Sequence, residues 1–187
     1  MAKSYYSTVF EQPADQVWSV IRDFNNYPIW VDGAGESEIE AGRSGDAVGA
    51  IRNVLYNGSR RRQKLLALSD VERTQVYTFE GAAPLPIWNF QATIRVTPVV
   101  DGDRAFVEWF ASFDCDADSF DERIAFFRDA FASWLESLRR HLALSRPHAE
   151  ERAAARVSKH EAAPSFETRP SAAPQDEAEV GCGPHGA

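Results

Sequence analysis

Two charged residues in strand-like segments are the first candidates for chemistry. Arg52 stands within the run Ile-Arg-Asn-Val, and Glu108 stands within the run Phe-Val-Glu-Trp-Phe. A charged side chain in an apolar strand either faces solvent or is buried with a partner, because an unpaired buried charge is costly. If both face inward, Arg52 and Glu108 form a buried catalytic pair that orients a substrate or moves a proton. The alternative stays open: Arg52 lies on the outer face, and Glu108 forms a surface pair with Arg95 worth well under ~1 kcal/mol.

Aromatic residues in the same kind of segment are candidates for shaping a cavity. Tyr56, Tyr77, Trp88 and Phe90 all lie in stretches rich in β-branched and aromatic residues, which are typical of strands. Such rings either contact a ligand or simply fill the core. The sequence leaves both interpretations open.

A short apolar loop precedes Trp88 and contains Leu85 between Pro84 and Pro86. Prolines restrict the backbone, so the loop either holds Leu85 over a cavity mouth as a lid or is a tight connection with little freedom.

Several other chemistries are disfavoured. No glycine-rich phosphate loop follows a strand-like run. The four histidines all lie outside the strand-rich region, so we expect neither a metal site nor a Ser-His-Asp triad, and no cofactor: His141, His148, His160 and His185. A basic cluster, Arg60 to Arg62 with Lys64, follows Asn57-Gly58. We expect it at a hairpin tip, either solvated or touching an anionic partner.

The elements that must position these residues are seven predicted strands. Short turn sequences such as Asn57-Gly58 separate them, which favours an antiparallel meander. The predicted strands are residues 5–11, 36–40, 47–56, 63–69, 75–80, 88–99 and 105–115.

Helical patterns stand on either side of the later strands. Pro13 suits the first turn of a helix whose apolar stripe contains Val17, Trp18 and Ile21, and a shorter helix or turn follows around Pro28. Between residues 118 and 144, apolar residues advance in steps of three and four, which predicts one long amphipathic helix. The fold class is therefore α+β, with a curved sheet packed on a helix.

Composition divides the chain into two parts. All five Trp, all five Tyr and eleven of the twelve Phe precede Leu144. We therefore expect a ligand-binding domain at 1–144 and a disordered tail at 145–187, because the tail buries too little apolar surface to offset its ordering entropy.

Charge and cysteine content limit the classes of partner and the cellular location that we expect. A net charge of −8 argues against nucleic-acid binding. No apolar run approaches the ~20 residues of a membrane span, and no secretory signal is evident. With only two cysteines, we expect a cytoplasmic protein with reduced thiols. The oligomeric state is not predicted.

The sequence resembles the START-like, or SRPBCC, superfamily. The resemblance covers about residues 5–144 and rests on PADQVWSVIRDFNNYPIW, VGAIRNV, QKLLALSDVERTQVYTF and the terminal helix. It looks closest to bacterial polyketide cyclase/dehydrase-like proteins and to the plant lachrymatory-factor synthases and abscisic-acid receptors. The resemblance implies a helix-grip fold, in which a seven-stranded antiparallel sheet wraps around the C-terminal helix, with two short helices after the first strand.

The resemblance also indicates which side chains of each strand face the cavity. In lachrymatory-factor-synthase-like proteins, an arginine matching Arg52 lies in the cavity and works with a carboxylate on the next strand, where this chain has Gln63. An amide cannot accept a proton at neutral pH. With this phase, the proline loop and the helical stripe, the predicted ligand-binding residues are Tyr56, Gln63, Leu65, Tyr77, Phe79, Leu85, Trp88, Phe90, Phe110, Phe127 and Phe131.

These features predict binding of a hydrophobic small molecule in an internal cavity. The first hypothesis is a polyketide cyclase/dehydrase-like protein acting on an aromatic or polyketide-type metabolite. If it is an enzyme, it is a cofactor-independent cyclase, dehydratase or isomerase in which Arg52 and Glu108 act on a carbonyl or a proton. The alternative is a non-enzymatic carrier or chaperone of a lipid or quinone. Gln63 weakens the catalytic hypothesis without affecting the binding one.

Overall fold

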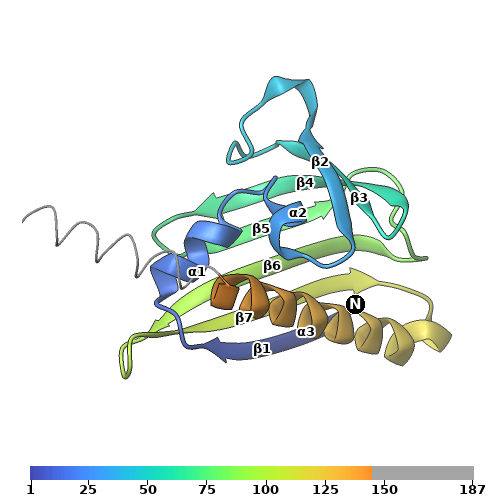
Figure 1. The fold of residues 1–187 in the computed structure, drawn as a ribbon. Coiled ribbons are helices and arrows are strands. Elements are labelled where there is room, and N and C mark those ends of the chain that lie inside the picture. Colours follow the sequence, from blue (N-terminus) through green and yellow to red (C-terminus); the bar gives the residue numbers. More distant parts are fainter. Residues whose placement is uncertain (145–187) are drawn as a thin grey trace, which may run out of the picture. The chain divides into compact units, whose positions relative to one another are not determined.

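Seven strands form one antiparallel sheet in the order β1-β7-β6-β5-β4-β3-β2 (Figure 1). The computed structural model describes residues 1–144, so the tail predicted at 145–187 lies outside the described residues. The sheet confirms the predicted antiparallel arrangement. The strands are β1 (Ala2–Phe10), β2 (Ala34–Ile39), β3 (Ile51–Tyr56), β4 (Ser59–Ser69), β5 (Thr74–Phe79), β6 (Trp88–Val99) and β7 (Arg104–Asp114).

Strands β3 and β4 meet in the tightest turn of the sheet. Asn57 and Gly58 both have positive φ, 47° and 76°, as a two-residue type I′ hairpin requires. Because pairing begins immediately at Ser59, Arg60–Arg62 lie inside β4 and not at the hairpin tip that we expected. This placement decides which way each arginine faces.

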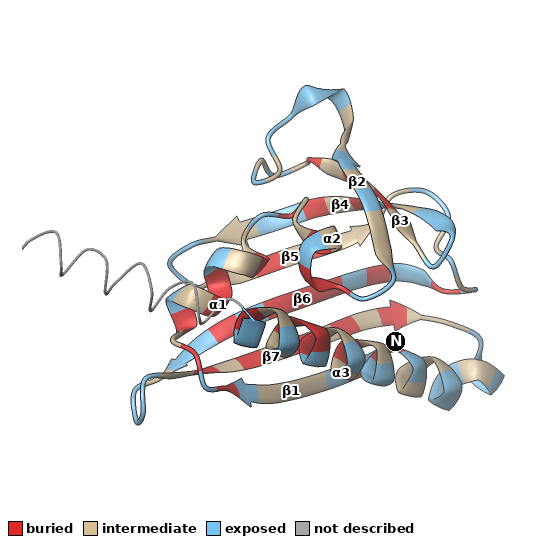
Figure 2. Ribbon diagram, viewed as in Figure 1, coloured by how far each residue is buried: buried red, intermediate tan, exposed pale blue. Residues whose placement is uncertain are grey.

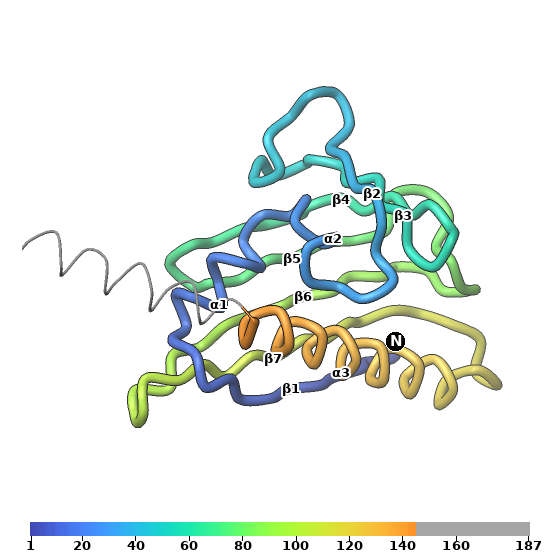
Figure 3. Tube along the Cα trace, viewed as in Figure 1, coloured from blue at the N-terminus to red at the C-terminus, as the bar shows by residue number. Residues whose placement is uncertain are grey.

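The first strand of the chain, β1, lies at one edge of the sheet and pairs with the last strand, β7. β1 pairs with β7 from Ala2↔Phe113 to Phe10↔Ala105, and Figure 3 shows the blue N-terminal strand beside yellow-green β7. The chain between β1 and β2 contains two short helices, α1 (Ala14–Ile21) and α2 (Tyr27–Trp30). Pro28 stands in the first turn of α2, where its missing N–H costs nothing.

The long C-terminal helix, α3 (Phe120–Leu144), follows a 3-10 turn at Ala117–Ser119; a similar turn at Glu40–Gly42 follows β2. One stripe of α3 is buried against the sheet, and Figure 2 shows it alternating with exposed positions. Its apolar members are Phe127, Phe131, Leu135, Leu138 and Leu142. Truncating one of these leucines to alanine would cost about 2–5 kcal/mol. Within residues 1–144, no helix is long and apolar enough to cross a membrane.

A polar network attaches α1 to the turn between β4 and β5. The Trp18 indole N–H donates to Asp70 Oδ1 over 2.9 Å, and the Arg22 guanidinium donates to both Asp70 oxygens, over 2.7 and 2.9 Å. The hydrogen bond from Arg22, followed by that from Trp18, lowers the pKa of the Asp70 carboxyl.

Replacing Asp70 with asparagine should therefore destabilise the fold in a pH-dependent way. Because the pKa of Asp70 is lower in the folded than in the unfolded protein, its ionised form stabilises the fold above the usual pKa of 3.8. This stabilisation is lost as the pH falls through the folded-state pKa. We expect Asp70→Asn to lower the urea midpoint at pH 7, and its difference from wild type to shrink as the pH falls below 3.8. Asp101→Asn, in an exposed turn, is the control; a pH-independent gap between Asp70→Asn and wild type would contradict the assignment.

Candidate functional site

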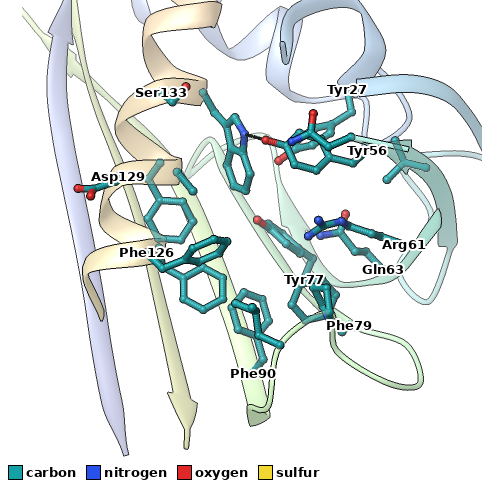
Figure 4. A pocket seen from close by; sticks show the side chains of 18 residues that line it. Tyr27, Tyr56, Arg61, Gln63, Tyr77, Phe79, Phe90, Phe126, Asp129 and Ser133 are labelled. Atoms are coloured by element: carbon teal, nitrogen blue, oxygen red, sulfur yellow. Dashed lines mark hydrogen bonds between the residues drawn. The ribbon is translucent and has the colours of Figure 1, made fainter. Parts of the chain in front are cut away.

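A cavity of about 440 Å³ lies between α3 and the inner face of the sheet (Figure 4). Its wall comes from α2, β3, β4, β5, β6, the loop containing Pro84 and Leu85, and one side of α3. A cavity of this size suits a small organic molecule. The lining residues are Tyr27, Val54, Tyr56, Asn57, Arg61, Gln63, Tyr77, Phe79, Pro84, Leu85, Phe90, Phe126, Phe127, Asp129, Ala130, Phe131, Ser133 and Trp134.

Aromatic rings form a continuous part of this wall. The ring centroids of Phe79 and Phe90 are 4.6 Å apart, and those of Phe90 and Phe127 are 5.1 Å apart. Phe127 in turn lies 6.0 Å from Phe131, one turn further along α3. These spacings leave ring faces and edges for an apolar ligand to stack against.

Two tyrosines in the cavity wall have hydroxyl groups that each already accept a hydrogen bond from an indole. The Trp109 indole N–H donates to the Tyr77 hydroxyl over 3.2 Å, and the Trp134 indole N–H donates to the Tyr56 hydroxyl over 2.8 Å. Burial raises the pKa of Tyr77, so its hydroxyl stays protonated at physiological pH. Since an indole only donates, each hydroxyl keeps its own hydrogen for a partner in the cavity.

Arg52 is buried beneath the cavity, with 2% of its surface exposed. Its guanidinium donates to the carbonyl oxygen of Phe24 and to the side-chain oxygen of Gln63, and its carbon centre lies 4.1 Å from the rings of both Phe24 and Tyr27. Desolvation lowers the pKa of Arg52. Arg52 is absent from the cavity lining, whereas Gln63, which accepts its hydrogen bond, lines the cavity.

Glu108 does not face the cavity, and this corrects the predicted catalytic pair. Side chains of β7 alternate, with Val107 and Trp109 buried against the core. Glu108 therefore lies on the opposite face, where Arg95 on β6 is directly across and donates to it over 3.4 Å. The surface pair that we kept as the alternative is the one present.

Phe110 is on the same outer face as Glu108 and is also a correction. It stacks on Tyr5 of β1 with ring centroids 6.3 Å apart, and the Lys3 ammonium lies 5.2 Å from its ring centroid. The reason is again the alternation along β7: Trp109 faces the core, so Phe110 lies with Glu108 on the outer face.

Two further predicted cavity residues lie elsewhere. Leu65 is fully buried in the core and is not part of the cavity lining. Trp88 is 48% exposed, although strict alternation would place it with Phe90. The register between β6 and β7 shifts after Trp88, and Asn89 adopts a positive φ of 53°, so a bulge turns Trp88 outward.

The remaining predicted ligand-binding residues all line the cavity: Tyr56, Gln63, Tyr77, Phe79, Leu85, Phe90, Phe127 and Phe131. Sequence reasoning missed Tyr27, Trp134 and Arg61. The signal for Arg61 was available, because it is two residues from Gln63 and therefore shares its face. Tyr27 gave no comparable signal, since it belongs to a helix of four residues.

The orientation of Gln63 can be tested through stability. We expect Gln63→Leu to lower the free energy of unfolding by about 2 kcal/mol, because the buried Arg52 charge loses a hydrogen-bond acceptor. Gln63→Glu should lower the free energy of unfolding by a smaller amount, since a carboxylate accepts the same hydrogen bond from Arg52. Urea unfolding at pH 7 measures both, with Glu108→Gln as a surface control that changes stability by less than about 1 kcal/mol. Equal effects of Gln63→Leu and Glu108→Gln would contradict the buried contact.

Comparison with known proteins agrees with this architecture. The family model described as polyketide cyclase/dehydrase and lipid transport matches residues 1–144. A protein from Nitrosospira multiformis is 30% identical, with a TM-score of 0.60 over 76% of this chain and 94% of its own. XoxI from Bacillus cereus is 27% identical, with a TM-score of 0.66 over 76% of this chain and 96% of its own.

A more distant structure shares the fold alone. One half of BexL, a di-domain ARO/CYC protein from a biosynthetic pathway, is 15% identical, with a TM-score of 0.67 over 78% of this chain and 48% of that one. A search among curated proteins gave no significant match. The match over residues 1–144 and the shared helix-grip architecture place the chain in its family: it belongs to the polyketide cyclase/dehydrase and lipid transport family of START-like proteins.

Proposed function

We propose that this protein binds a hydrophobic aromatic or polyketide-type metabolite in the cavity between α3 and the sheet. The observation that carries the proposal is the cavity of about 440 Å³ with its row of phenylalanine rings. Burying an apolar ligand against these rings supplies the affinity, at about 25 cal/mol for each Å² removed from water. The family description, which joins cyclases with lipid transport, supports the same class of ligand.

Catalysis on such a ligand would depend on hydrogen-bond donors. The Tyr56 and Tyr77 hydroxyls and the Gln63 amide are available to polarise a carbonyl group, which favours enolisation, and so cyclisation or dehydration. Among the described lining residues the acid is Asp129, which is exposed and paired with Arg128 over 3.1 Å. A base buried in the wall is therefore missing from this part of the chain.

That observation favours a second candidate function, a carrier of a lipid or quinone. A carrier needs an apolar cavity and a mouth, and it needs no base. Mass spectrometry of ligands extracted from the purified protein separates the two candidates. Recovery of an intact lipid or quinone supports the carrier; recovery of a polyketide-type compound together with its cyclised or dehydrated form supports the enzyme.

Cavity binding can be tested without knowing the natural ligand. N-phenyl-1-naphthylamine is a neutral aromatic probe whose fluorescence rises in apolar surroundings. We expect it to bind wild type and to lose at least about tenfold in affinity in Ala130→Trp, because the indole would fill the cavity from α3.

Ala143→Trp is the matched control, since Ala143 is exposed further along the same helix. It should bind the probe like wild type. Equal binding by wild type and both variants would place the probe outside the cavity and contradict the proposal.

A further inference from the structure

Three consecutive arginines in β4 divide between the two faces of the sheet. Arg60 and Arg62 face outward and are neutralised there: Arg60 lies 3.0 Å from Glu36, and Arg62 donates twice to Glu40, over 2.7 Å each. Because side chains alternate along a strand, the residue between them faces inward. Arg61 lies directly across from Val54, a cavity-lining residue, and itself lines the cavity.

Arg61 differs from its two neighbours in having no acidic partner among the described residues. Its guanidinium carbon lies 4.8 Å from the centroid of the Tyr56 ring, and its Nε atom is buried without a hydrogen-bond partner. Arg61 also borders a second hollow that continues outward between Phe79 and Pro84. Arg61 therefore borders both the apolar cavity and this outer hollow.

The acidic groups nearby do not neutralise Arg61. Asp129 belongs to α3, is paired with Arg128, and in Figure 4 its carboxylate points away from the cavity. Glu80 borders the outer hollow and lies 3.9 Å from the Lys64 ammonium. The charge of Arg61 is therefore left for a ligand to balance.

The polar groups that accompany Arg61 in the wall offer hydrogens. Gln63 uses its carbonyl oxygen to accept from Arg52, which leaves its NH₂ group for the cavity. The Tyr56 and Tyr77 hydroxyls accept from indoles and so have their hydrogens left to donate. Figure 4 shows Tyr77, Arg61 and Gln63 around the same part of the cavity. A ligand group that accepts several hydrogen bonds and carries negative charge fits this wall.

We propose that the ligand is a hydrophobic carboxylic acid, whose carboxylate is bound by Arg61 with Tyr77 and Gln63 as further donors. The apolar body of the acid lies along the phenylalanine rings. This inference rests on the proposed function and narrows its ligand class. A guanidinium binds a carboxylate through two parallel N–H groups, which an amide or a single hydroxyl cannot imitate.

The test compares 2-naphthoate with its methyl ester, which keeps the ring system and removes the charge. Displacement of N-phenyl-1-naphthylamine gives both affinities. In wild type we expect the acid to bind at least about tenfold more tightly than the ester. In Arg61→Gln that preference should disappear, with the ester affinity changed less than about twofold.

Arg60→Gln is the matched control, because Arg60 belongs to the same run and borders the outer hollow but does not line the cavity; it should keep the preference for the acid. Arg61→Met, which keeps the apolar stem over Tyr56, replaces Arg61→Gln if the latter does not fold. If the probe binds in the cavity but acid and ester bind equally to wild type, or if the preference survives in the Arg61 variants, the inference is wrong while the proposed function stands. If the probe is insensitive to Ala130→Trp, the proposed function itself fails.

Discussion

The buried guanidinium of Arg52 is the constraint on which the arrangement around the cavity depends. Taking an arginine out of water is tolerated only if its N–H groups find acceptors and its charge is stabilised. Here the acceptors are the backbone of Phe24 and the side chain of Gln63, and the faces of Phe24 and Tyr27 lie against the planar group. One side chain on β3 thereby holds β4 and the segment between α1 and α2 in place, and the cavity opens on the other side of Gln63.

The same contacts give the cavity its polarity. An amide and a phenol can each both donate and accept, so their roles depend on what is already bound to them. Arg52 occupies the carbonyl of Gln63, and the indoles of Trp109 and Trp134 occupy lone pairs of the two tyrosines. Core packing thus occupies one acceptor position on each of these three groups and leaves their hydrogens to be donated. Arg61, which only donates, completes a wall that favours acceptors.

Much of the fold could be predicted because its periodicities are strong. The stripe from Phe127 to Leu142 is legible in the sequence, and the boundaries of β6 were predicted as the structure has them. The phase of β7 was misjudged because Phe106 and Phe110 were given too much weight, although the polar residues Arg104, Glu108 and Ser112 alternate with apolar ones and mark the outer face. The outward orientation of Trp88 depends on the positive φ of Asn89, which no residue pattern revealed. Arg61 was overlooked because the arginine run was interpreted as one cluster, whereas alternation separates its members.

The identity of residue 63 determines what kind of chemistry the cavity supports. A glutamate there would neutralise Arg52 and place a proton acceptor at the wall, so the protein would supply both the cation and the base. Glutamine keeps the hydrogen bond to Arg52 but adds no negative charge, so the positive charge beneath the wall is not balanced by this contact. The Asp23 carboxylate acts on Arg52 from the far side of the wall, whereas Arg61 has no acidic partner in residues 1–144, so Arg61 is the guanidinium in the cavity wall whose charge is left over. The carboxylate that we propose for the ligand would supply the negative charge that a glutamate at residue 63 would have contributed.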